Sequence, residues 1–196
     1  MSVPYQAQGR VRQKQRTREA LVAATRALLR EGRTPTVEEA GAAASVSRTT
    51  AYRYFPTQRD LLVATHPEID RSSMLGADAP TEVAERFAAV LDEIERQIVE
   101  NEVTLRTMLR LSLEHPNERD GLLLRQGRRQ VWIEDALSPL QSTLEPASFR
   151  RLVLAITSAT GIESFVWLTD VGGLDRQEAL AVMRYSGITL LASAAS

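Results

Sequence analysis

Residues 45–56, with the sequence SVSRTTAYRYFP, combine guanidinium, hydroxyl and phenol side chains in twelve positions. The chain has only four tyrosines and four phenylalanines, and three of those rings, Tyr52, Tyr54 and Phe55, lie in this stretch. Arginine can donate a bidentate pair of hydrogen bonds to guanine or pair with a phosphate. Hydroxyl and phenol groups mostly bond to phosphates. This combination of side chains favours contact with a nucleic acid.

The stretch is expected to be a short helix, because Ser47 can cap its beginning and Pro56 ends it. Because successive residues of a helix are rotated by about 100°, four polar side chains fall within one arc of roughly 140° around the helix axis. These are Arg48, Thr49, Tyr52 and Arg53. Ala51 and Tyr54 lie on the opposite side and are expected to anchor the helix to a core. The alternative is a solvated arginine face with tyrosines that only pack.

The preceding residues predict the helices that hold this one in place. Apolar residues at three- and four-residue intervals predict a helix from Thr17 to Gly32, and Thr36 can cap a second helix over 37–44. Residues 45–47 are long enough only for a tight turn, and a fourth helix is expected from Thr57. Two short helices joined by such a turn form a helix-turn-helix arrangement.

The rest of the chain also shows helical periodicity. Residues 67–79 are expected to form a loop or a broken helix. The predicted helices cover about 80–101, 102–115, 118–140, 147–170 and 174–194. No segment has the alternation of a strand. The prediction is an all-α protein of about nine helices.

Composition limits the classes of function. The 196 residues contain no cysteine, which excludes disulfides, thiolate metal sites and a thiol nucleophile. We expect a cytoplasmic protein without a membrane-spanning segment, because no uncharged apolar run approaches about 18 residues and no apolar signal core is present. A helical enzyme is the hypothesis from another class, but the chain has no Gly-rich phosphate loop, no cluster of metal ligands and no serine elbow. No cofactor and no enzymatic activity are expected.

Charge is distributed unevenly along the chain. Residues 1–60 carry eleven Arg or Lys against five Asp or Glu, whereas the remaining residues carry thirteen against twenty. A basic first third is expected to be the part that meets a polyanion. Within residues 1–16 and just beyond, cations occupy every second position, namely Arg10, Arg12, Lys14, Arg16 and Arg18. This segment is either a basic arm that contacts phosphates or a frayed, solvated terminus.

Residues 17–65 resemble the DNA-binding domain of TetR/AcrR-family transcriptional regulators. The most specific part is VSRTTAYRYFPTQRDLL, residues 46–62, which is similar to the family's run of valine-serine, a variable triplet, an apolar residue and Tyr-X-Tyr-Phe. The resemblance implies a three-helix helix-turn-helix domain over 17–65, preceded by the arm 1–16. It also implies a helical ligand-binding and dimerisation domain over 66–196.

The resemblance places the major-groove helix at residues 47–54. The residues expected to contact DNA are Thr36, Ser47, Arg48, Thr49, Thr50, Tyr52, Arg53 and Arg59. The chain departs from the family pattern at three positions. Ser45 replaces a frequent turn glycine, Glu38 replaces a basic residue, and Gln58 replaces a lysine at the start of the fourth helix. We expect the basic arm to compensate for a weaker fourth-helix contact.

The resemblance further implies a small-molecule pocket among the middle helices. Its candidate residues are Phe87, Met108, Arg110, Leu111, Trp132 and Phe165, and the alternative for each apolar one is plain core. A homodimer through the last two helices is also implied. The faces considered are Leu180, Met183, Gly187, Leu190 and Leu191, and Leu152, Ala155, Ile156, Ala159 and Val166. The alternative is that both faces are buried within their own domain.

The leading hypothesis is a ligand-responsive transcriptional regulator, most simply a repressor that binds double-stranded DNA at a palindromic operator as a dimer. The alternative is a helical small-molecule-binding protein that no longer binds DNA specifically. Glu38 and Gln58 favour that alternative, because neither offers a phosphate the positive charge that the family pattern supplies. The sequence does not identify the effector or the operator.

Overall fold

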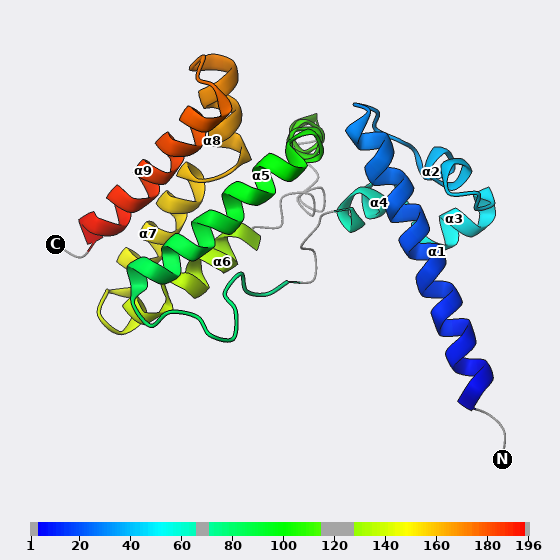
Figure 1. Ribbon diagram of the computed structural model, residues 1–196, viewed down its shortest axis with the longest axis horizontal. Helices are drawn as coiled ribbons and strands as arrows, with labels where there is room; N and C mark the ends of the chain where they lie inside the picture. Colours follow the sequence, from blue (N-terminus) through cyan, green and yellow to red (C-terminus); the bar gives the residue numbers. More distant parts are fainter. Residues whose placement is uncertain (1–3, 66–70, 115–127, 195–196) are drawn as a thin grey trace. The chain divides into compact units, whose positions relative to one another are not determined.

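A computed structural model describes residues 4–65, 71–114 and 128–194, with side chains from residue 11 onward (Figure 1). Over these ranges the regular structure is helical and contains no strand, so the prediction of an all-α protein is confirmed. The chain folds as two compact units. The N-terminal unit holds α1 to α4 and the end of α5 from Arg110. The C-terminal unit holds α5 up to Leu109 and α6 to α9.

The N-terminal unit comprises four helices: α1 (Pro4–Arg30), α2 (Val37–Ala43), α3 (Arg48–Tyr54) and α4 (Gln58–Ala64). The three short helices agree with the predicted positions. Each begins at a hydroxyl cap, at Thr36, Ser47 and Thr57 respectively. Their apolar faces share one core with α1, formed by Leu21, Val22, Val37, Ala40, Ala51, Phe55, Leu61 and Ala64.

The predicted start of the first helix at Thr17 is wrong, because α1 begins at Pro4. Its first turns extend beyond α2, α3 and α4 (Figure 1). The apolar core begins at Leu21, the Arg18 guanidinium lies over the Phe55 ring, and residues 11–16 are all exposed. Apolar periodicity marks a buried face, so an unburied extension carries no such signal. Gln, Arg and Lys are good helix formers and can propagate a helix that Leu21 and its neighbours already stabilise.

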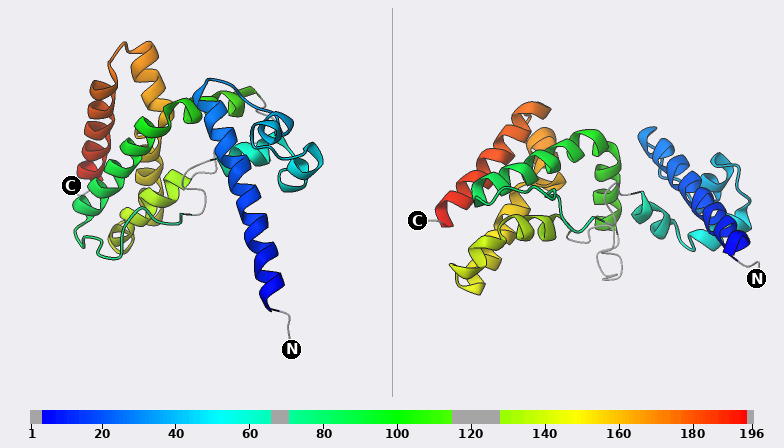
Figure 2. Two further views of the ribbon diagram at one scale, coloured as in Figure 1. Left: turned by 45° about the vertical axis from the view of Figure 1, so that its right-hand side comes forward. Right: turned by 60° about the horizontal axis from the view of Figure 1, so that its bottom comes forward.

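Figure 2 shows the helices of the C-terminal unit from two further sides. They are α5 (Val83–Glu114), α6 (Arg128–Ala136), α7 (Pro146–Ala159), α8 (Ile162–Val166) and α9 (Arg176–Ala194), with two short helical turns, η2 (Ser138–Ser142) and η3 (Trp167–Val171). Residues 71–79 form the expected loop. The predicted boundary near Asn101 is a kink within α5, where the backbone has φ −124° and ψ 19°. The predicted helix over 118–140 ends at Ala136, and its residues 118–127 lie outside the described ranges.

The predicted helix over 147–170 is broken between α7 and α8. The cause lies in Arg129 of α6, whose Nε donates to the Thr157 carbonyl at 3.2 Å and whose Nη2 donates to Glu163 at 2.9 Å. The guanidinium occupies the space beside Gly161, where an added Cβ would lie only 2.0 Å from the Arg129 Cζ. The arginine thus satisfies a carbonyl near the end of α7. A single-helix periodicity cannot show this insertion.

Residues Pro146–Val171 are long and apolar enough, by length and mean hydropathy, to qualify as a membrane span, which the sequence analysis did not anticipate. A buried core helix passes the same test. Phe149, Val153 and Ile156 belong to the core of the C-terminal unit, and the segment is interrupted at Gly161. The qualification is therefore weak evidence for a membrane.

Candidate nucleic-acid interface

The turn between α2 and α3 is held by backbone hydrogen bonds. The Val46 N–H donates to the Gly41 carbonyl at 2.8 Å, and the Ser45 N–H donates to the Ala42 carbonyl at 3.1 Å. This pair of bonds is the Schellman arrangement that ends many helices. It requires a left-handed residue, and Ser45 has φ +55°. Ser45, which stands where the family often has glycine, is thus in the left-handed region that favours glycine.

Ser45→Gly is expected to stabilise the protein by about 0.5–1 kcal/mol, because a left-handed conformation costs a residue with a Cβ about 1–2 kcal/mol and glycine loses more chain entropy on folding. The midpoint of thermal unfolding should rise by about 1–4 °C. Ala44→Gly is the matched control, since Ala44 has φ −86° and should gain nothing from glycine. A lower midpoint for Ser45→Gly than for the unsubstituted protein would contradict this account of the turn.

Helices α2 and α3 pack closely because their facing residues are small. A Cβ added to Gly41 would meet the Ala51 Cβ at 3.0 Å and the Val46 carbonyl at 3.1 Å. Ala51 is fully buried, and Phe55 anchors the end of α3 with 2% of its surface exposed. These contacts fix the orientation of α3 on α2. The predicted anchoring role of Ala51 is confirmed.

The opposite side of α3 faces solvent. Arg48, Thr49, Tyr52 and Arg53 are all exposed, as predicted from the helical arc. The Arg48 guanidinium lies 5.8 Å from the Tyr52 ring centre, and the Arg53 guanidinium lies 5.8 Å from the Tyr54 ring centre. The aromatic rings thus support both guanidinium groups along the helix. This exposed set is the candidate interface.

Ser47 and Thr50 form local hydrogen bonds at the start of α3. The Thr50 N–H donates to the Ser47 Oγ at 3.3 Å, and the Ser47 hydroxyl donates to the Thr50 Oγ1 at 2.9 Å. Ser47 is exposed and Thr50 is partly exposed. Both hydroxyls retain acceptor capacity, but their first role is to cap the helix.

Thr36 is the N-cap of α2 in a reciprocal capping box with Glu39. The Thr36 N–H donates to Glu39 Oε2 at 2.8 Å, and the Thr36 hydroxyl donates to the same oxygen at 3.0 Å. The bond from the backbone N–H, followed by that from the hydroxyl, lowers the pKa of the Glu39 carboxyl below its ordinary value. A phosphate approaching Thr36 would therefore meet a carboxylate already bound there.

At the start of α4, the departure Gln58 and the DNA-contact candidate Arg59 are both partly buried. The Gln58 amide donates to the Pro35 carbonyl at 2.9 Å and fixes the segment before α2. Two nitrogens of Arg59, Nε and Nη2, are buried and have no hydrogen-bond partner in the described part of the chain. Gln58 is thus engaged within the unit, and Arg59, a predicted DNA contact, is partly buried. The sequence had indicated Gln58 as a departure but not its structural role.

Arg48 has an acidic neighbour from the preceding helix. Its Nη1 lies 3.3 Å from Glu38 Oε2, and both side chains remain more than half exposed. Sequence reasoning identified Glu38 as an unusual acidic residue but did not pair it with Arg48. The pairing depends on how closely α2 packs on α3, which the small residue at position 41 permits.

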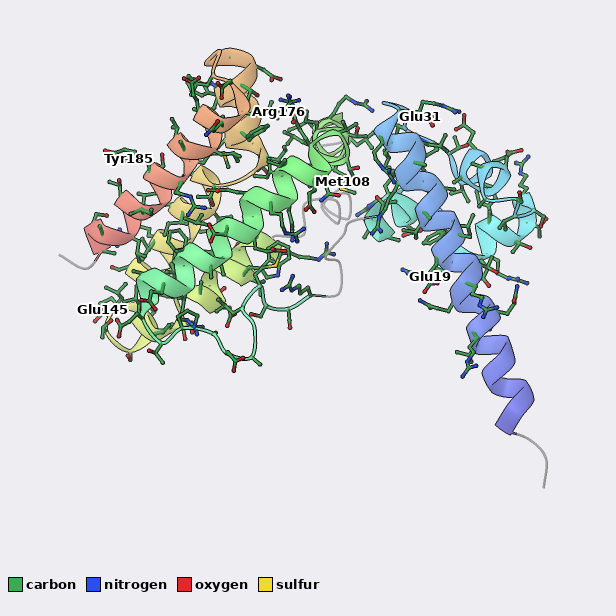
Figure 3. The ribbon with its side chains drawn as sticks, viewed as in Figure 1. Glu19, Glu31, Met108, Glu145, Arg176 and Tyr185 are labelled. Carbon is green, nitrogen blue, oxygen red and sulfur yellow. The ribbon has the colours of Figure 1, made fainter. Side chains whose placement is uncertain are left out.

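The ligand candidates lie in two different units. Phe87, Trp132 and Phe165 belong to one core cluster in the C-terminal unit and are at most 3% exposed. The Trp132 indole donates to the Arg71 carbonyl at 2.9 Å. Met108 of α5, labelled in Figure 3, is assigned to the same unit and is 4% exposed. Arg110 and Leu111 belong to the N-terminal unit, where Arg110 donates to the Thr34 hydroxyl at 3.2 Å.

The faces considered for dimerisation are buried or partly buried within the C-terminal unit. Leu152, Ile156, Met183 and Gly187 are buried, and α7 packs on α9. The opposite face of α9 is exposed and apolar: Val182 is 39%, Tyr185 71% and Ile188 50% exposed. Tyr185 points away from the helix in Figure 3. Both sides of α9 are therefore apolar, and the sequence analysis considered only the side that packs within the unit.

No protein-family model, no curated protein and no solved structure matches this chain. Within the residues that the structure describes, no group of three or more His, Cys, Asp or Glu side chains is placed to hold a metal ion. The function must therefore be inferred from the side chains themselves and their geometry.

Proposed function

We propose that this chain is a DNA-binding transcriptional regulator whose helix α3 enters the major groove. The observation that carries the proposal is the exposed set Arg48, Thr49, Tyr52 and Arg53 on a helix whose other side is anchored by Ala51. A helix of seven residues is about 10 Å long and fits a groove about 12 Å wide. The guanidinium groups would bond to base edges or phosphates, and the hydroxyl and phenol groups would fix the register.

The exposed basic segment of α1 supports the same partner. Arg12, Lys14 and Arg16 are exposed, and no acidic residue precedes Glu19. Glu19 itself accepts a hydrogen bond from Gln15 at 2.8 Å. This helix extends beyond its core and carries cations on several sides. Its positive charge complements the negative charge of a DNA backbone.

The test is capture of fragments from a genomic library by the purified full-length protein, followed by a mobility shift on the enriched fragments. We expect a palindromic site and a steep loss of affinity with added salt. Failure to enrich any fragment, with a folded protein, would reject the proposal. The resemblance also leads us to propose repression of the bound gene and relief by a small molecule held in the C-terminal unit.

A homodimer is part of the proposal, because a helix-turn-helix protein commonly binds two half-sites about one DNA turn apart. On α9, Val182, Tyr185 and Ile188 fall within an arc of about 120°. That exposed apolar arc lies opposite the buried Met183 and is the surface we assign to the second copy. Effector binding would act by favouring one of two dimer conformations.

Tyr185→Glu is expected to convert the dimer to a monomer at micromolar concentration, because a charge would be buried in an apolar interface. Sedimentation equilibrium measures the change in mass. Gln141→Glu adds the same charge at an exposed site in η2 and should leave the mass unchanged. An unaltered dimer in Tyr185→Glu would exclude this face of α9.

A helical small-molecule-binding protein that does not bind DNA specifically remains the second candidate. It is favoured by the internal bonds of Thr36 and Gln58 and by the acidic partner of Arg48. This candidate predicts weak binding that is equal for all fragments. The fragment capture distinguishes the two functions directly.

A further inference from the structure

The side chains of Glu38 and Arg48 form an ion pair across the helix-turn-helix, and this pair has a consequence for DNA binding. Glu38 lies in the first turn of α2, and Arg48 is the first residue of α3. Their charged groups are 3.3 Å apart, with side-chain exposures of 53% and 68%. The pair is therefore open to solvent and can be exchanged for another partner.

The two arginines of α3 differ in their surroundings. Arg53 lies over the Tyr54 ring and has no ion pair in the described residues. Arg48 is held between the Tyr52 ring and the Glu38 carboxylate. Within the described residues, Arg53 thus has no ion-pair partner, whereas Arg48 is paired with a carboxylate. A phosphate that binds Arg48 must either displace the Glu38 carboxylate or lie close to it, where the two negative charges repel each other.

Glu38 is also the acid of α2 that remains beside α3. The neighbouring Glu39 is committed to Thr36, and Arg33 lies 3.6 Å from its other oxygen. Glu38 has no role in that capping box. Its removal should therefore leave the start of α2 intact, so the charge effect can be measured separately from folding.

We propose that Glu38 determines specificity by holding Arg48 away from phosphates and so lowering the affinity for DNA of arbitrary sequence. The inference rests on the proposed function of α3. Phosphate contacts carry no sequence information, whereas a guanidinium aligned by a carboxylate can still offer its free N–H groups to a base edge. When Glu38 is paired with Arg48, the protein therefore loses affinity that is the same for every DNA sequence.

The probe is a fluorescein-labelled duplex of 30 base pairs with mixed sequence, and its binding is followed by anisotropy over a range of salt concentrations. Glu38→Gln should bind this duplex about five to ten times more tightly than the unsubstituted protein at about 0.1 M salt, because one further cation becomes available to a phosphate. The slope of log K against log salt should steepen by about 0.9 for each Arg48 released.

Two controls separate this effect from a general change in charge. Glu31→Gln removes one exposed carboxylate at the C-terminal end of the N-terminal unit's first helix and should leave the slope unchanged (Figure 3). Arg48→Ala combined with Glu38→Gln should show no more binding than Arg48→Ala alone. Thermal unfolding of each variant verifies that the fold is retained.

The captured genomic fragment supplies the second measurement. Glu38→Gln should lower the ratio of affinities for that fragment and for the mixed duplex by about fivefold. The inference is overturned if the slope for the mixed duplex is unchanged, if both affinities rise equally, or if the gain persists without Arg48. Absence of any binding by the unsubstituted protein would instead reject the proposed function, so the two failures are distinct.

Discussion

Arg53→Ala is expected to weaken binding to the captured DNA fragment by about 10- to 100-fold, because one bidentate arginine contact to a base is worth about 1–3 kcal/mol. Arg53 is exposed on α3, and its guanidinium has no ion pair to break in the described residues. The loss of affinity should therefore come from the interface rather than from the fold. The separate variant Tyr52→Ala should also reduce affinity, because it removes a phosphate contact and the ring that lies against Arg48.

Arg150→Ala provides the matched control, since Arg150 is an exposed arginine of α7 in the C-terminal unit. It removes the same charge and should change the affinity by less than about twofold. The mobility shift measures affinity, and circular dichroism verifies the helical content. Equal losses for Arg53→Ala and Arg150→Ala would mean that charge alone matters and that α3 is not the interface.

Neutralising the basic extension of α1 is expected to have the second large effect. Replacing Arg10, Arg12, Lys14 and Arg16 with glutamine should reduce the slope of log K against log salt by as much as about 3.6 per protomer, since each lost phosphate contact contributes about 0.9. Affinity should fall by about 100-fold or more at about 0.1 M salt for both captured and mixed DNA. Affinity measured over a range of salt concentrations gives this slope and so tests whether the extension contacts phosphates.

The substitutions should leave the stability of the N-terminal unit nearly unchanged. Residues 11–16 are exposed, and the core begins at Leu21. Glutamine keeps a good helical propensity, so the helix should persist. An unchanged salt slope would support the alternative of a solvated terminus without a DNA contact.

The candidate interface could largely be predicted from the sequence because its determinants are local. Hydroxyl caps, the proline after Phe55 and a helical arc fix which side chains of α3 share a face. Their exposure follows once Ala51 is buried. The departure at Ser45 was visible in the sequence as the loss of a frequent turn glycine, and the residue has φ +55°.

Contacts between distant residues could not be predicted in the same way. The insertion of Arg129 beside Gly161 joins positions 32 residues apart along the chain and breaks a helix that periodicity extends. The pairing of Glu38 with Arg48 depends on the close approach of two helices. Helix α9 is apolar on two sides, so its buried face depends on where α7 packs.

The absence of cysteine allows the central claim to be tested with a single introduced thiol. Thr49→Cys, carrying an iron–EDTA cleavage reagent, would place the reagent on the exposed side of α3, and Gln141→Cys would place it on η2. The sites of strand cleavage on the captured fragment are then mapped. We predict cleavage from position 49 confined to bases within each half-site, and none there from position 141. Full binding without cleavage from position 49 would contradict the claim that α3 enters the groove.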